Sequence, residues 1–208
     1  RRFRMIRHAG EFGLQTEATG FDAAAIVARK RRLIGEFADY RRSQLEGGGF
    51  DLLRGRAAFE DGRLRVLVSD GESLVVQAAR LLIETASDIP RPPLPGLADV
   101  PALDSDAILE MESLPASVVV LGAGPVALEM ATYAALFGVE VTVVQRNVQV
   151  LTGTDPDCAA AVADGMRAEG VRIHTGTRIE RIFQTPGGVG VRFADGGGTR
   201  TVEAAALW

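Results

Sequence analysis

The sequence predicts an α/β protein with a parallel sheet and a small antiparallel β-meander, preceded by a second and less regular region. Three observations lead to this fold class. From residue 117 onward β-branched runs alternate with helical segments, glycines fall at the joins, and a proline-rich stretch precedes this regular half. Strands that alternate with helices indicate parallel strands connected by right-handed crossovers.

The regular half is expected to contain three parallel strands and two helices before the meander. These elements are a strand at 117–121, a helix at 125–137, a strand at 140–144, a helix from 156 to about 169, and a strand within 171–176. Asp155 or Thr154 suits the N-cap of the second helix, and Pro156 suits its first turn, where the missing amide hydrogen costs nothing. A glycine follows each helix, which is typical of a helix end. Residues 178–208 alternate as an antiparallel meander does.

The first half contains one long helical pattern. Asp22 suits its N-cap, because a carboxylate accepts the unpaired amide hydrogens of a first turn. Apolar residues then recur at helical spacing through Tyr40, and three glycines at 47–49 end the helix. The basic run at 29–32 is interpreted as the solvated face of this helix; contact with a phosphate or a partner is the alternative.

Short strands and a linker follow the long helix. Between residues 50 and 86 we expect strands separated by turns such as Asp61-Gly62, with the last strand within 73–86. Prolines then recur from Pro90 to Pro101. Since proline lacks the amide hydrogen of a sheet ladder and disfavours helix at the residue before it, this stretch reads as a linker. We therefore predict two domains, residues 1–98 and 99–208.

The composition of the chain disfavours some classes of binding partner. The 208 residues carry a formal net charge of −4, which disfavours a general nucleic-acid binder. The chain has no apolar run of the ~18 residues that a membrane span needs, so we expect no membrane partner. The single cysteine, Cys158, excludes an internal disulfide, and the cytoplasm is the default expectation for location.

The amino-terminal residues are rich in arginine. Arg1, Arg2, Arg4 and Arg7 would suit a transit peptide or a helix on a membrane surface. The segment lacks serines and a clear apolar stripe, which disfavours both of these interpretations. The interpretation that we favour is that the chain is a piece of a longer protein.

The stretch "SVVVLGAGPVALE" carries the most specific signal. Gly122, Gly124 and Ala127 match the spacing G-x-G-x-x-G/A, between a β-branched run and a helix. The first glycine allows a sharp turn, the second allows a diphosphate to approach the backbone, and the alanine allows close packing of helix on strand. The amide hydrogens near Pro125 and Val126 would face the anion. We predict a Rossmann-like nucleotide site from these five residues; a glycine turn that serves packing alone is the alternative.

The end of the second strand bears on which nucleotide is bound. An NAD site usually has an acid here, which accepts hydrogen bonds from the ribose hydroxyls, whereas a 2′-phosphate favours an arginine. This chain has Gln145 and Arg146, and the guanidinium donors suit a phosphate. We therefore favour NADP over NAD. In the alternative, Arg146 lies in solvent and Gln145 bonds the ribose of NAD.

With these motifs in place, the chain resembles the flavoprotein pyridine nucleotide-disulfide oxidoreductases, such as glutathione reductase, dihydrolipoamide dehydrogenase and mercuric reductase. Four segments carry the resemblance in the family's order: "LLIETASDIPRPPLPGL", "LDSDAILEMESLPASVVVLGAGPVALEMA", "VEVTVVQRNVQVLTGTDPD" and "EGVRIHTGTRIERI". The resemblance implies that residues 1–98 are part of an FAD-binding domain and that residues 99–208 are the NAD(P)-binding domain. It also implies a parent enzyme that is a homodimer.

The departures from the family define what the chain is expected to lack. We find no FAD-binding glycine turn, no C-x-x-x-x-C redox pair and no carboxyl-terminal dimerisation domain with its His-Glu pair. The family's Ala-Thr-Gly near the flavin is Glu84-Thr85-Ala86 here. His8, His174 and Cys158 match no catalytic position of the family. We therefore expect a fragment that does not hold FAD, has no metal site and is inactive alone.

One catalytic residue of the family has a counterpart. Glu129 matches the glutamate after the glycine turn that faces the nicotinamide in these enzymes; a solvent-facing helix residue is the alternative. Pro125 replaces an aromatic residue often found there, so gating by a ring is not expected. The favoured function is the nucleotide-binding part of an FAD-dependent NAD(P)H oxidoreductase, which passes hydride from nicotinamide to flavin and on to a disulfide, a metal ion or another acceptor. The alternatives are a stand-alone nucleotide-binding or sensor module and a different Rossmann enzyme.

Overall fold

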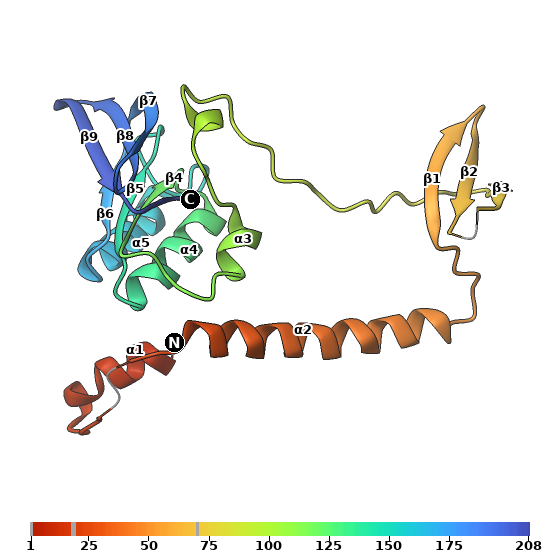
Figure 1. Ribbon diagram of the computed structural model, residues 1–208, viewed down its shortest axis with the longest axis horizontal. Helices are drawn as coiled ribbons and strands as arrows, with labels where there is room; N and C mark the ends of the chain where they lie inside the picture. Colours follow the sequence, from red (N-terminus) through yellow and green to blue (C-terminus); the bar gives the residue numbers. More distant parts are fainter. Residues whose placement is uncertain (1, 18–19, 70) are drawn as a thin grey trace. The chain divides into compact units, whose positions relative to one another are not determined.

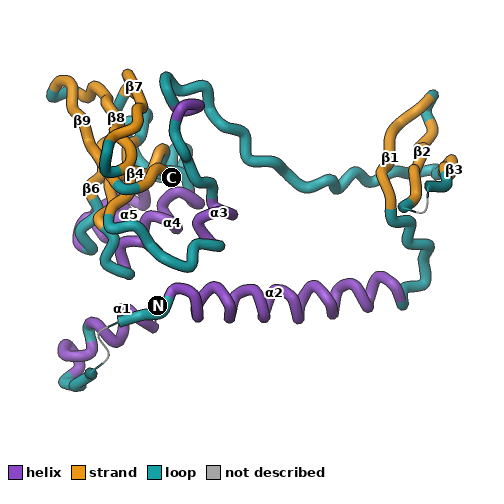
Figure 2. The backbone as a smooth tube through the Cα atoms, viewed as in Figure 1, coloured by secondary structure: helices purple, strands orange, loops and turns teal. Residues whose placement is uncertain are grey.

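A computed structural model describes residues 2–17, 20–69 and 71–208 (Figures 1 and 2). The chain forms two compact units. Unit 1 comprises Arg1–Ala28 and Pro90–Trp208, and unit 2 comprises Arg29–Ile89. The mixed α/β architecture, with a parallel sheet and antiparallel strands, confirms the predicted fold class.

Unit 1 is built around a four-stranded parallel sheet of order β10-β4-β5-β6. Its strands are β4 (Ser117–Leu121), β5 (Glu140–Val144), β6 (Arg172–His174) and β10 (Ala206–Leu207). The first three were predicted. The fourth corrects the prediction that the meander extends to residue 208: Ala206 and Leu207 leave it and pair in parallel with Val118 and Val119. The change of sheet buries Leu207 completely.

Helices α4 (Pro125–Leu136) and α5 (Pro156–Ala168) connect the parallel strands. Asp155 is the N-cap of α5, and its side chain accepts a hydrogen bond of 3.0 Å from the amide of Asp157. The short α3 (Ser105–Leu109) was not predicted. It begins at Asp104, whose carboxylate accepts from the Ala107 amide at 2.9 Å, so an acidic N-cap was the signal in the sequence.

Alternate residues of the parallel strands face opposite sides of the sheet. Val118, Val120, Val141 and Val143 pack with α4 and α5 in one core. Val119 and Val144 face the other way and pack with the meander. A strand has a period of two, so two covered faces produce the continuous valine runs of this sequence. Figure 1 shows α4 and α5 on one side of the sheet and β7–β9 on the other.

The meander consists of β7 (Arg178–Thr185), β8 (Gly188–Asp195) and β9 (Gly198–Ala204), paired antiparallel in that order. Ile182, Val191 and Phe193 point toward the parallel sheet and are almost fully buried. The meander therefore closes the second core of unit 1.

The end of the proline-rich stretch packs against the meander. Gly96 precedes the short 3-10 helix η2 (Leu97–Asp99), and Leu97 and Val100 are buried in the meander core. Gly96 has a φ of +80°, and a Cβ there would lie 2.0 Å from the carbonyl oxygen of Ile182. The Ile182 amide donates to the carbonyl of Pro95 at 2.8 Å. Only glycine fits this contact.

The amino-terminal segment also belongs to unit 1. It contains α1 (Arg2–Arg7) and a 3-10 helix, η1 (Ala9–Phe12). The Phe3 and Phe21 rings lie 5.0 and 4.5 Å from the ring of Phe137, at the end of α4. Arg4 forms a 2.8 Å ion pair with Glu169 after α5. Aromatic contacts and one ion pair therefore join this segment to the carboxyl ends of both helices.

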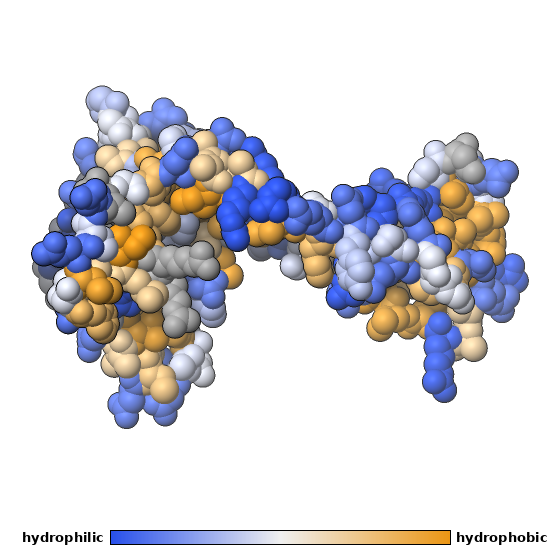
Figure 3. Space-filling model, turned by 90° about the horizontal axis from the view of Figure 1, so that it is seen from below, coloured by the Kyte–Doolittle hydropathy of each residue, from blue (hydrophilic) through white to orange (hydrophobic). Residues whose placement is uncertain are grey.

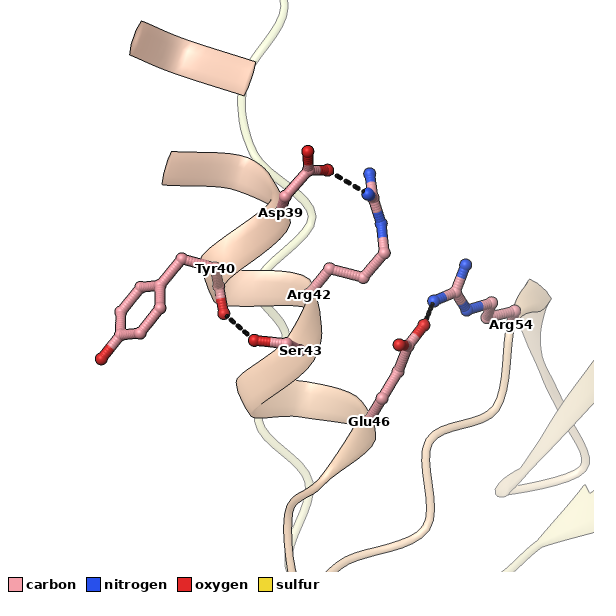
Figure 4. A network of polar contacts seen from close by, with 6 residues as sticks. All are labelled: Asp39, Tyr40, Arg42, Ser43, Glu46 and Arg54. Atoms are coloured by element: carbon pink, nitrogen blue, oxygen red, sulfur yellow. Dashed lines mark hydrogen bonds and ion pairs between the residues drawn. The ribbon is translucent and has the colours of Figure 1, made fainter. Parts of the chain in front are cut away.

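Helix α2 (Ala23–Glu46) begins in unit 1 and continues into unit 2. The predicted N-cap is confirmed, because Asp22 Oδ1 accepts from the Ala25 amide at 2.9 Å. Near its end, Asp39 and Arg42 form an ion pair of 2.5 Å, and Glu46 pairs with Arg54 beyond the helix (Figure 4). These pairs are exposed and contribute little to stability.

The rest of unit 2 is a three-stranded antiparallel sheet of β1 (Gly55–Glu60), β2 (Arg63–Val68) and β3 (Ser73–Val76). Asp61 and Gly62 have φ values of +49° and +74°, so the predicted hairpin turn is of the type in which both central residues are left-handed. The expectation of strand structure through residue 86 was wrong after Val76. Residues 77–94 form neither helix nor strand, because no described strand lies beside them to complete a ladder.

Unit 2 buries few of its apolar side chains. Phe37 on α2 is 60% exposed and Phe59 on β1 is 55% exposed, while Val66 is the apolar residue of this sheet that is buried. Figure 3 shows apolar side chains at the surface of both units. Ala86 takes a φ of +62°, a left-handed conformation that favours glycine. In the part of the chain that the structure describes, every helix is too short or too polar to cross a membrane.

Candidate functional site

The carboxyl ends of β4 and β5 meet at the glycine turn. Gly122 has a φ of +94°, which turns the chain sharply off β4, and its amide donates to the carbonyl of Val144 at 2.9 Å. The amide of Leu151 donates to the carbonyl of Ala123 at 2.8 Å, which ties the loop after β5 to the turn. The site lies where the open α/β sheets of other proteins bind ligands, outside the carboxyl ends of the strands.

The space beside this turn is open. A Cβ added to Gly122 or to Gly124 would meet no described atom within 4 Å. The turn and the loop after β5 enclose a hollow of about 300 Å³. It is lined by Gly122, Ala123, Gly124, Pro125, Gln145, Arg146, Asn147, Leu151, Thr152 and Thr154.

The amino end of α4 faces outward without a capping side chain. Gly124 is the N-cap residue, and no side chain of the described residues caps the helix there. The first intrahelical bond is from the Leu128 amide to the Gly124 carbonyl, at 3.0 Å. The amide hydrogens of Val126 and Ala127 precede it and are left as donors, at the positive end of the helix dipole. Because this helix is twelve residues long and begins at an open hollow, it can receive an anion.

The side chains around these donors differ in exposure. Ala127 is half-buried and packs against the helical core, so its small size permits close approach of α4 to the sheet. Val126 is 54% exposed. Pro125 occupies the first helical position, where its missing amide hydrogen removes no bond.

Gln145 and Arg146 occupy different environments at the end of β5. Gln145 is 6% exposed, and its Nε2 donates to the carbonyl of Gln149 at 3.3 Å and to Thr152 Oγ1 at 3.5 Å. Arg146 is exposed, and its guanidinium has no hydrogen bond or ion pair to any described residue. The structure thus gives the amide a role within the loop and leaves the cation free at the rim of the hollow.

Glu129 lies outside this hollow. It is exposed on α4, one turn after Pro125, and lines a second, largely apolar hollow of about 510 Å³ between α4 and α5. Pro125 and Leu151 line both hollows. Tyr133 lines the second one, and burial raises the pKa of its hydroxyl. The glutamate is therefore near the glycine turn but not part of the same cavity.

His8, Cys158 and His174 do not line the hollow at the glycine turn. His8 contacts Glu11 at 2.8 Å on the surface, and Cys158 is exposed in the first turn of α5. His174 Nδ1 lies 3.8 Å from Asp195 Oδ2 at the meander. Within the described ranges, no three histidine, cysteine or acidic side chains gather as metal ligands would.

Burial and charge set the titration of the His174 and Asp195 pair. Desolvation lowers the pKa of His174, and the positive charge of Arg200 lowers it further, against the opposing effect of Asp195. The pKa of Asp195 is lowered chiefly by the hydrogen bond that it accepts from the Gly197 amide at 2.8 Å, and also by Arg200. At neutral pH the folded protein therefore favours the neutral imidazole of His174 and the charged carboxylate of Asp195.

Three polar residues of the hollow were not predicted from the sequence as part of the site. Asn147 Nδ2 donates to Thr152 Oγ1 at 2.8 Å, and Thr154 lines the same wall. They follow Arg146 in a loop of no regular pattern, so spacing does not reveal them. Their only signal was position, directly after the second strand of a crossover.

A parallel sheet whose glycine turn opens at the carboxyl ends of its strands defines the class of dinucleotide-binding α/β domains. Comparison with known proteins is more specific. The family of pyridine nucleotide-disulphide oxidoreductases matches residues 14–207. The chain belongs to this family, which confirms the resemblance drawn from its motifs.

Individual relatives agree with this assignment. The chain is 30% identical over 197 residues to a mercuric reductase of Streptomyces lividans, covering 94% of this chain and 41% of that protein. It is 32% identical over 176 residues to a soluble pyridine nucleotide transhydrogenase of Mycobacterium bovis, covering 83% and 37%. The chain therefore spans less than half the length of these relatives.

Solved structures show the same fold. LpdA from Mycobacterium tuberculosis superposes with a TM-score of 0.79 at 23% identity, over 99% of this chain and 45% of that one. The flavoprotein disulfide reductase RclA from Escherichia coli, as a Cu(II) complex, gives a TM-score of 0.71 at 25% identity, over 98% and 44%.

Proposed function

We propose that the chain is the nucleotide-binding portion of an FAD-dependent NAD(P)H oxidoreductase. The observation that carries the proposal is the uncapped amino end of α4 facing an open hollow. Two amide donors and two glycines without side chains suit the diphosphate of a dinucleotide in charge, hydrogen bonding and size. Family membership supplies the reaction class.

Each group at the site has a distinct task in this proposal. The amides of Val126 and Ala127 hold the diphosphate, and Gly124 lets it approach the backbone. The free guanidinium of Arg146 pairs with a 2′-phosphate, which favours NADP over NAD. Glu129 faces the nicotinamide end, one helical turn from Pro125.

In the parent enzyme, the nicotinamide supplies a hydride that the flavin accepts and passes on to a disulfide, a metal ion or another acceptor. This chain orients the dinucleotide for that transfer. We place the FAD contacts of this chain in residues 1–98, and propose that they do not hold FAD alone. For the parent we propose a homodimer, from the resemblance, with the cytoplasm as the default location.

The test is a flavin absorbance scan of the purified chain, followed by calorimetric titration with NADPH and with NADH. We expect a colourless protein that binds NADPH more tightly than NADH. Arg146→Glu replaces the attraction for a 2′-phosphate by repulsion, so NADPH binding should weaken about tenfold to hundredfold, the cost of a hydrogen bond to a charged group, while NADH binding persists.

Arg181→Glu is the matched control, since Arg181 is also exposed but lies on β7 outside the hollow. It should leave both affinities unchanged. An NADPH:NADH ratio that Arg146→Glu does not move would reject the NADP assignment, and bound FAD at a 1:1 ratio would reject the claim about the flavin.

A further inference from the structure

The loop after β5 is held in place by the residues around His174, at the end of β6. The amide of Gln145 donates to the carbonyl of His174 at 2.8 Å, and the amide of Thr177 donates to the carbonyl of Gln145 at 3.0 Å. A third bond runs from the amide of Gly176 to the carbonyl of Asn147, at 2.7 Å. Gln145 and Asn147 line the hollow at the glycine turn, so the wall of the hollow is joined directly to the backbone at His174.

The register of the parallel sheet places His174 at the same edge as the glycine turn. Leu121, the residue before the turn, pairs with Val144, and Val144 pairs with His174. Since neighbouring strands lie about 4.8 Å apart, the backbone of His174 is roughly 10 Å from the start of the turn. A diphosphate bound at the turn carries two negative charges. At a separation of about one Debye length, salt screens these charges only in part.

The imidazole of His174 lies in a cluster of charged groups from three strands. Its Nδ1 is 3.8 Å from Oδ2 of Asp195 on β8, and the same oxygen accepts from Nε of Arg200 on β9 at 2.8 Å. Desolvation, Arg200 and Arg172 on β6 lower the pKa of His174, whereas Asp195 raises it. A further negative charge nearby would act in the same direction as Asp195 and favour the charged ring.

We propose that His174 is a proton switch linked to the nucleotide site: it takes up a proton from solvent when an anionic dinucleotide binds, and the protonated ring then pairs with Asp195. This inference rests on the proposed function and adds its regulation by pH. The diphosphate favours a positive charge at its edge of the sheet, and the protonated imidazole has a hydrogen on Nδ1 for the carboxylate. By reciprocity the protonated chain binds the dinucleotide more tightly, so affinity rises as pH falls.

The experiment follows the imidazole signals of the 208-residue chain by NMR between pH 8 and 5, with and without saturating ADP-ribose. This probe has the diphosphate and the adenosine of a dinucleotide, and it has no group that titrates in this range. We expect the midpoint of the His174 titration to rise by about half a pH unit. His8, the other histidine of the chain, contacts Glu11 on the surface and is the internal control. Its curve should be the same with and without the probe.

The affinity of the chain for ADP-ribose provides the reciprocal test. It should be about threefold higher at pH 5 than at pH 8, the factor that half a pH unit implies. His174→Gln keeps a polar side chain but cannot take up a proton, so this dependence should vanish while the affinity at pH 8 stays within about twofold. Asp195→Asn retains an acceptor for the Gly197 amide and removes the charge that favours the protonated ring. Proton uptake then moves to lower pH, and the change in affinity over this range should be smaller than in the wild type.

The outcomes separate this inference from the function on which it rests. A His174 midpoint that ADP-ribose does not raise, or a pH dependence of affinity that persists in His174→Gln, would overturn the switch and leave the proposed function standing. An Asp195→Asn variant with the dependence of the wild type would overturn the role of the carboxylate. A chain that binds no ADP-ribose up to millimolar concentration would overturn the switch and the proposed function together.

Discussion

In unit 1, β4 and β5 lie between two cores and bury both of their faces, whereas the sheet of unit 2 leaves most of its apolar side chains exposed. Val119 and Val143 are fully buried, while Phe59 and Leu67 are more than half exposed. Both sheets have β-branched and aromatic residues, so composition does not separate them. The difference is that unit 1 contains the helices and the meander that cover its sheet, and unit 2 has no described layer over its own.

This comparison indicates where the folding free energy resides. Burial of apolar surface contributes roughly 25 cal/mol per Å², so a sheet with two covered faces is far more stable than one with little cover. The single tryptophan, Trp208, is 7% exposed in the helical core of unit 1. Its fluorescence therefore reports the unfolding of unit 1 and allows the comparison to be tested.

The largest effect is expected from a pair of phenylalanine truncations. Phe193 is fully buried in the meander core, and Phe193→Ala should cost about 3–5 kcal/mol in the free energy of unfolding. Phe59→Ala in unit 2 should change it by less than about 0.5 kcal/mol, because that ring is exposed. Urea denaturation followed by Trp208 fluorescence measures the cost in unit 1, and circular dichroism of the same samples measures the cost in unit 2. Equal costs would contradict the difference between the units.

The next effect concerns the contact between the linker and the meander. Gly96→Ala places a Cβ against the Ile182 carbonyl in a left-handed conformation, and should cost about 2 kcal/mol or more. Gly187→Ala is the control, since a Cβ there meets nothing within 4 Å. Thermal unfolding of the two variants compares them. A Gly96→Ala variant as stable as the control would mean that the linker end is not anchored on β7.

Two exposed glycines in helices allow a further comparison of the two units. Gly165→Ala in α5 should raise the stability of unit 1 by about 0.5–1 kcal/mol, because alanine loses less backbone entropy in a helix. Gly35→Ala in α2 should raise helical circular dichroism but leave the transition of Trp208 nearly unchanged. Neither position has a neighbour within 4 Å of an added Cβ. A shift of that transition by Gly35→Ala would show that α2 unfolds together with unit 1.

The smallest effect is a pH dependence confined to unit 1. The folded pKa of His174 lies below its ordinary value of 6.5, so the unfolded chain binds the proton first as pH falls. The contribution of His174 to the free energy of unfolding is therefore fully present above about pH 6.5. It declines as the pH falls below this value, until the imidazole of the folded protein is also protonated. His174→Gln should flatten this decline when unfolding is measured between pH 8 and 5. Asp195 does not interfere, since its lowered pKa moves its titration below 3.8.

The sequence allowed the regular part of unit 1 to be predicted almost element by element. Gly122, Pro125, Asp155 and Pro156 mark the ends of strands and helices through local backbone chemistry, which a sequence displays directly. The partner of β10 was missed because Ala206 and Leu207 alternate like the meander before them. Their change of sheet depends on pairing with Val118, almost ninety residues earlier in the chain.

The sequence allowed the glycine turn of the candidate site to be predicted, but not the hydrogen bonds between the side chains around it. The spacing of Gly122 and Gly124 reveals a turn, and the φ of +94° at Gly122 is one that favours glycine. Gln145 and Thr152 meet through the conformation of an irregular loop, in which Leu151 and Gly153 have positive φ values. No periodicity encodes such a loop, so the network had to be read from the structure.

The central claim is that the amide donors at the start of α4 hold the diphosphate of a dinucleotide. The most direct test is a titration of the isotopically labelled chain with NADPH, followed through the backbone amide signals of unit 1. The account predicts that the signals of Val126 and Ala127 move most and saturate with the binding curve. Saturated binding that leaves these two signals in place, with the changes elsewhere in the chain, would contradict it.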